Sequence, residues 1–141
     1  MNTPEPKYRF PTADAIKKLA TRFRLPSGPD MQDWEWEVAD CSRIDEFLSV
    51  YESEPLSDDE RFTLMEIIIQ SFEDLASGCN LVSEPRWKRT MGILETNIAL
   101  HAYSVWYWSC QQAEDEDEAF HVSPFMKEII ALKRDHFASA A

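Results

Sequence analysis

Residues 57–76, SDDERFTLMEIIIQSFEDLA, form the clearest helical pattern of the chain and indicate its fold class. Ser57 and Glu60 make a capping box, and the acids that open the stretch suit the positive end of a helix dipole. Apolar residues then recur at intervals of three and four, as one face of a helix requires. They are Phe62, Met65, Ile69, Phe72 and Ala76. Further apolar residues at 64, 67, 68 and 75 widen this stripe, so we expect the middle of the helix to be buried on most sides.

A second long pattern begins at Ser83 and reaches Trp108. Seven residues recur at alternating intervals of four and three: Trp87, Met91, Leu94, Ile98, His101, Val105 and Trp108. This spacing predicts one helix at the centre of the fold. Four large rings follow within two turns, at 103, 106, 107 and 108. They cannot all point inward, so at least one should lie at an interface or at the rim of a pocket.

Three shorter apolar patterns predict helices over about 12–25, 43–53 and 123–137. The Pro-rich residues 1–11 should be an extended arm, residues 138–141 a loose end, and the acidic run 114–118 a solvated loop or a frayed helix end. A chain of 141 residues fits one domain, and no internal repeat or linker is visible. The sequence therefore predicts an all-α single domain over 1–141, a bundle of about five helices.

The segment 33–38 does not fit the helical pattern. Trp34, Trp36 and Val38 alternate with Asp33, Glu35 and Glu37, and a period of two is typical of a strand. Because no second convincing strand exists, we expect an extended segment that lies on the helices. Pairing with a partner or with a second copy of the chain is the alternative.

Charge is distributed unevenly. The net charge is −12, and residues 30–60 hold twelve acids and one base, whereas residues 1–29 hold six bases and two acids. This balance disfavours binding to nucleic acid and to anionic membranes, and it favours a basic protein partner. The basic first helix could instead cover part of the acidic block, and both arrangements stay open.

The two tryptophans within the acidic block have two interpretations. As a partner-binding site, Trp34 and Trp36 would anchor the contact while Asp33, Glu35 and Glu37 steer a basic partner toward it. Alternatively, one or both rings fold onto the bundle, because large apolar side chains are usually buried.

A second candidate site surrounds His101. Asn97 lies four positions before it, and the pair could be catalytic or ligand-binding, or His101 could be a core histidine with a hydrogen bond. A pocket there would be lined by Asn97, His101, Tyr103, Trp106 and Tyr107. The other histidines and cysteines lack the tight spacing of metal ligands, and no phosphate loop, nucleophile elbow or dinucleotide fingerprint occurs. We expect no metal and no cofactor.

Three widely spaced cysteines, Cys41, Cys79 and Cys110, are typical of reduced thiols in a cytoplasmic protein, and no signal peptide or membrane-spanning run is visible. The favoured function is that of a small acidic binding protein, an inhibitor or immunity-type protein that masks a basic partner. Two alternatives remain: a helical enzyme or ligand-binding protein with a pocket near His101, and a homodimeric scaffold.

Overall fold

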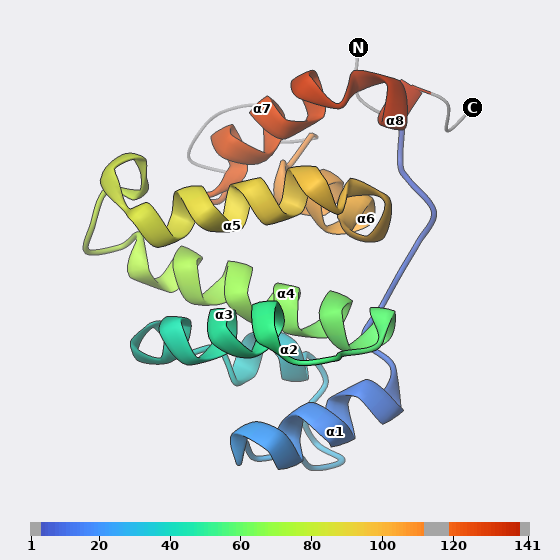
Figure 1. The fold of residues 1–141 in the computed structure, drawn as a ribbon, viewed down its shortest axis with the longest axis vertical. Coiled ribbons are helices and arrows are strands. Elements are labelled where there is room, and N and C mark those ends of the chain that lie inside the picture. The colour runs from blue at the N-terminus through green and yellow to red at the C-terminus, as the bar shows by residue number, and fades with distance from the viewer. Residues whose placement is uncertain (1–3, 112–118, 139–141) are drawn as a thin grey trace. The chain divides into compact units, whose positions relative to one another are not determined.

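The computed structural model describes residues 4–111 and 119–138, and every regular element within these ranges is a helix (Figure 1). The eight α-helices there are α1 (Ala13–Phe23), α2 (Trp34–Glu37), α3 (Ile44–Ser53), α4 (Asp58–Leu75), α5 (Pro85–Thr96), α6 (Ile98–Trp108), α7 (Ser123–Leu132) and α8 (Arg134–Ala138). Two short 3-10 helices, Cys41–Arg43 and Leu81–Ser83, precede α3 and α5. The all-α fold class is confirmed. The expectation for residues 114–118 lies outside the described residues.

The chain groups into two compact units. The first unit is Phe10–Leu75, and the second unit combines Met1–Arg9 with Ala76–Ala141. In the first unit, α1, α2 and α3 all pack against α4, and in the second unit α5, α6 and α7 pack against one another while α8 contacts α6 and α7. The organisation as one domain stays a prediction.

Helix α4 is the centre of the first unit. Its capping box has both expected bonds, because the Glu60 amide donates to Ser57 Oγ and the Ser57 amide donates to a Glu60 carboxylate oxygen, each at 3.2 Å. Residues 62–69 are all buried. Eight consecutive buried residues span more than two turns, so the helix is covered in every direction, as the width of its apolar stripe predicted.

Two phenylalanines join α1 to α3 in the same core. The rings of Phe23 and Phe47 meet edge to face with centroids 5.1 Å apart, and both are almost fully buried. The Arg43 guanidinium lies over both rings and donates a 2.8 Å hydrogen bond to the Phe23 carbonyl. Each buried phenylalanine contributes about 1.5–3 kcal/mol relative to an exposed one.

The extended conformation expected for residues 33–38 is wrong: the segment forms the short helix α2. Trp34 and Val38 lie one helical turn apart, and both are buried. A helix satisfies its own backbone groups, and here the Val38 amide donates to the Trp34 carbonyl at 3.0 Å. A single strand would leave those groups without partners, which explains why the helix forms despite the alternating pattern.

The single helix expected from 83 to 108 is also wrong, because it divides into α5 and α6 at Asn97. Asn97 leaves the helical conformation, with φ −109° and ψ 37°. Its amide still donates to the Ile93 carbonyl at 2.9 Å, and its carbonyl still accepts from the His101 amide at 3.1 Å. The interruption is therefore one residue long and preserves the phase of the apolar stripe. The predicted helix 123–137 divides similarly at Lys133.

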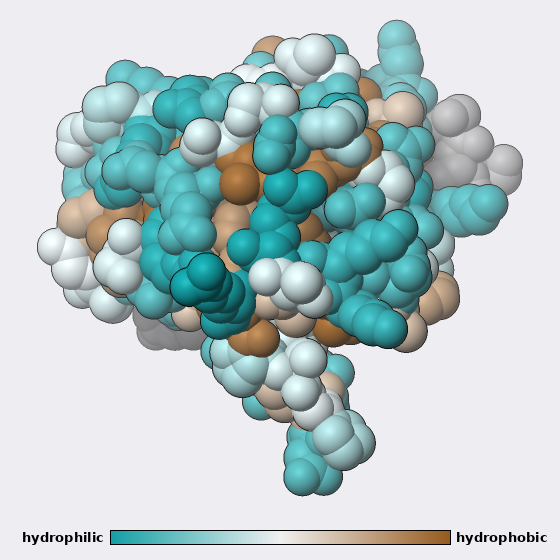
Figure 2. Space-filling model, turned by 60° about the horizontal axis from the view of Figure 1, so that its bottom comes forward, coloured by the Kyte–Doolittle hydropathy of each residue, from teal (hydrophilic) through white to brown (hydrophobic). Residues whose placement is uncertain are grey.

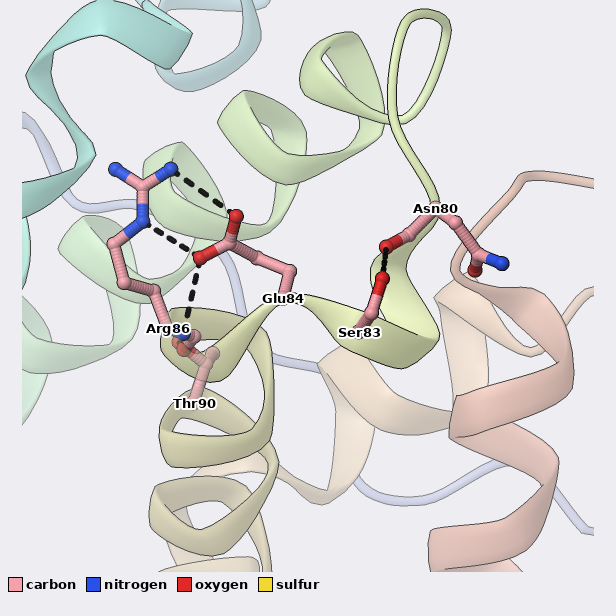
Figure 3. Close-up of polar contacts among 5 residues, drawn as sticks. All are labelled: Asn80, Ser83, Glu84, Arg86 and Thr90. Atoms are coloured by element: carbon pink, nitrogen blue, oxygen red, sulfur yellow. Dashed lines mark hydrogen bonds and ion pairs between the residues drawn. The ribbon is translucent and has the colours of Figure 1, made fainter.

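The start of α5 is built from polar side chains that lie close in sequence (Figure 3). The Glu84 carboxylate accepts from the Arg86 amide at 3.1 Å and from Arg86 Nε at 2.9 Å, which joins the helix cap to an ion pair. This pairing lowers the pKa of Glu84. Ser83 Oγ donates to the Asn80 carbonyl at 3.2 Å and closes the preceding turn.

Ser123, the first residue of α7, is hydrogen-bonded to both of its neighbours in this region. Ser123 Oγ donates to the Trp108 carbonyl at 2.7 Å and accepts from the Phe120 amide at 3.0 Å. The end of α6 and the start of α7 are thereby held together. No helix among the described residues has the length and apolar character needed to cross a membrane.

Candidate functional site

The negative charge of the protein is concentrated in the first unit. Residues 10–75 contain sixteen Asp and Glu and six Lys and Arg, a net charge of −10 out of −12 for the whole chain. Eight of these acids, all from the block 30–60, have exposed side chains: Asp30, Asp33, Glu37, Asp45, Glu46, Glu52, Asp58 and Asp59. We call these eight residues the acidic group. Figure 2 shows one face of the molecule, on which hydrophilic residues predominate.

Trp34 lies in the core of the first unit. Its side chain is 3% exposed, and the indole N–H donates a 2.7 Å hydrogen bond to the Pro26 carbonyl. This bond ties α2 to the turn that follows α1. The ring therefore folds onto the helices, as one of the two interpretations of the tryptophan pair expected.

Trp36 differs from Trp34 because its ring is only half-buried. Its indole N–H donates a 3.2 Å hydrogen bond to a carboxylate oxygen of Glu66, which is itself buried on α4. The aromatic ring thus lies on α4 with part of its surface in solvent. Its neighbours in the sequence are Glu35 and Glu37. Of the two tryptophans, only Trp36 has a surface that a partner can reach.

The carboxylates of α2 influence one another. Burial raises the pKa of Glu35, and the negative charges of Asp33 and Glu37 raise it further. The Asp33 amide donates a 3.1 Å hydrogen bond to Glu37, which closes the first turn of α2. Asp33 and Glu37 remain exposed, so this short helix presents two carboxylates beside the half-buried Trp36.

The basic first helix covers the acidic block only in part. Arg22 pairs with Glu54 at 3.0 Å, while Lys18 pairs with Asp14 on its own helix at 3.1 Å. Asp14 raises the pKa of Lys18, and Glu60 adds a smaller contribution. Glu54 and Glu60 do not belong to the acidic group, so these two contacts of α1 fall on other carboxylates of the block.

A cleft of about 690 Å³ separates α1 from the turn between α3 and α4. Its walls carry three bases and two acids, in contrast to the acidic balance of the first unit as a whole. The lining residues are Asp14, Lys17, Lys18, Thr21, Arg22, Pro55 and Glu60. The Arg22–Glu54 pair lies beside this cleft and is half-exposed, so solvent screens it.

His101, the centre of the predicted pocket, is a buried histidine. His101 is 0% exposed and lies on the inner side of α6, with Ser104, at 1% exposed, one turn later. Asn97 is at the break between α5 and α6, where its carbonyl rather than its side chain meets the His101 amide. This burial favours the interpretation of a core histidine. A catalytic or ligand-binding role for the pair stays a prediction.

The surplus aromatic residues of α6 lie at the surface of the second unit. Trp108 is buried, whereas Tyr103, Trp106 and Tyr107 are half-exposed, as the crowding of four rings in two turns required. Tyr103 stacks on Tyr107 with centroids 6.5 Å apart and lies 5.8 Å from Trp106.

Two rings from distant parts of the chain extend this cluster. Tyr8, 63% exposed, packs edge to face on Tyr103 at 5.0 Å, and Phe120 lies 6.3 Å from Tyr107. We call the five residues the aromatic strip: Tyr8, Tyr103, Trp106, Tyr107 and Phe120. Sequence reasoning missed Tyr8 and Phe120, because nothing in a local pattern indicates which distant ring will pack on a helix.

Within 4–111 and 119–138, no group of three or more His, Cys, Asp and Glu side chains could hold a metal ion. No protein-family model matches the sequence, and no curated protein or solved structure is similar enough to indicate a relationship.

Proposed function

We propose that the protein is a small acidic binding protein that uses its first unit to mask a basic partner. The observation that supports this most is the net charge of −10 on residues 10–75, with eight exposed carboxylates from the block 30–60. A charge of this size attracts a basic protein over a distance of about one Debye length, ~8–10 Å at ordinary salt. An inhibitor or immunity-type protein would use such attraction to reach its target quickly.

Electrostatic attraction needs an apolar contact to hold the complex together, and Trp36 is the residue suited to that role. Tryptophan is enriched at the centres of interfaces, where the surrounding contacts exclude water from it. Its ring is partly accessible, and two exposed carboxylates lie at the ends of the same short helix, Asp33 as the residue that precedes it and Glu37 as its last residue. We therefore assign steering to the acidic group and anchoring to Trp36.

The test is affinity capture from a lysate of the source organism at low and high salt, with mass spectrometry to identify the retained protein. The variants are Trp36→Ala, which removes the anchor, and the double variant Asp45→Asn with Glu52→Gln, which removes two exposed charges. Glu128→Gln is the matched control, since it removes an exposed charge from the second unit. Each lost charge should weaken binding about 1.5–5-fold, the equivalent of ~0.2–1 kcal/mol, and the control should not.

Kinetics with the captured protein separates the two roles. Salt and the double variant should slow association, whereas Trp36→Ala should speed dissociation. Retention of a basic protein that responds to neither Trp36→Ala nor the charge variants would contradict the proposal, as would equal sensitivity to Glu128→Gln.

A second candidate function is that of a homodimeric scaffold, and the aromatic strip favours it. Five neighbouring rings in contact, three of them half-exposed on α6, form the kind of surface that proteins use for association. Light scattering at two concentrations tests this function. Trp106→Ser should shift a dimer toward monomer, while Leu132→Ser, at an exposed apolar residue outside the strip, should not. A monomer at both concentrations removes this candidate.

A further inference from the structure

We draw no further inference here: the strongest candidate, the cleft between α1 and the turn that joins α3 to α4, carries none, because its Lys18 and Arg22 are already paired with Asp14 and Glu54 and nothing in the structure shows which ligand would replace those pairs.

Discussion

Replacing Trp34 by alanine should destabilise the protein far more than replacing Trp36, although the two residues are neighbours in an alternating sequence. Trp34 is 3% exposed and donates a 2.7 Å hydrogen bond to the Pro26 carbonyl. Removing a buried tryptophan side chain leaves a cavity and typically costs about 3–5 kcal/mol. Within that total, the lost hydrogen bond accounts for about 0.5–1.5 kcal/mol, because Pro26 is exposed and water can reach its carbonyl. The half-buried Trp36 should cost about 1–2 kcal/mol, since it gives up less buried area.

Urea unfolding followed by far-ultraviolet circular dichroism measures both losses. A third variant, Trp34→Phe, removes the indole N–H with a smaller loss of buried volume than alanine, so it sets an upper bound on the cost of the hydrogen bond to Pro26. We expect the loss in free energy of unfolding to decrease in the order Trp34→Ala, Trp34→Phe, Trp36→Ala, with the first variant well separated from the others. Among the variants that remain folded, Trp36→Ala should weaken binding of a partner the most, because only Trp36 has an accessible ring.

The reasoning is refuted if Trp34→Ala loses less than about 1 kcal/mol and also abolishes partner capture, because surface positions rarely cost more. That result would mean that Trp34 reaches solvent and that the anchoring role assigned to Trp36 belongs to its neighbour. Equal losses for the two alanine variants would also refute the burial difference on which the assignment depends.

Four further predictions concern residues with defined environments. Ser57→Ala removes the α4 cap and should lower the free energy of unfolding by about 1 kcal/mol, measured by urea unfolding, with Ser57→Gly costing less. His101→Ala should lower it by at least about 2 kcal/mol, because the imidazole is fully buried, and a folded variant of unchanged stability would favour the functional interpretation. The raised pKa of Glu35 means that the native state holds the carboxyl proton more tightly than the unfolded state, so the protonated group favours folding below its ordinary pKa and this stabilisation is lost as pH rises. Glu35→Gln should therefore stabilise the protein at neutral pH and not at pH 3. Thermal unfolding at the two pH values would show the difference. Burial raises the pKa of Tyr51 to about 12, so stability should fall between pH 10 and 12 and Tyr51→Phe should reduce that fall in unfolding measured across this range.

Local signals predicted the helices that depend on local chemistry. The capping box at Ser57 and the stripe that follows specify both the start of α4 and its burial, because backbone donors and nearby side chains decide them. The start of α7 at Ser123 was readable for a similar reason, since proline is tolerated in the first turn.

The segment 33–38 was misread because two periods coincide in a short window. Trp34 and Val38 are four apart, a spacing that lies on one face of a strand and also on one face of a helix. The packing of α2 against α4, more than twenty positions away, and the hydrogen bond to Pro26, eight positions away, decide between them, and neither contact lies within the window that shows the alternation.

The sequence contains a signal for the break at Asn97, but the apolar pattern continues across it. Asparagine favours caps and turns over helix interiors, since its side chain competes for backbone hydrogen bonds. The stripe nevertheless continues through Ile98 and His101 in the same phase, because the His101 amide still reaches the Asn97 carbonyl. Periodicity alone therefore could not separate α5 from α6.

The acidic character of residues 30–60 can be counted from the sequence. The exposure and the pairing of the individual carboxylates cannot, because they depend on the fold. The pair between Arg22 and Glu54 spans 32 positions and is half-exposed, so it is worth about 0–1 kcal/mol. A contact this weak does not withdraw Glu54 from a competing cation, and Arg22 offsets one charge among sixteen. Because long-range attraction depends on the summed charge and not on single pairs, the net charge of −10 on the first unit would attract a basic protein despite the basic helix. The strength of any complex must then come from apolar contacts such as Trp36, since exposed charges alone contribute rate and specificity more than affinity.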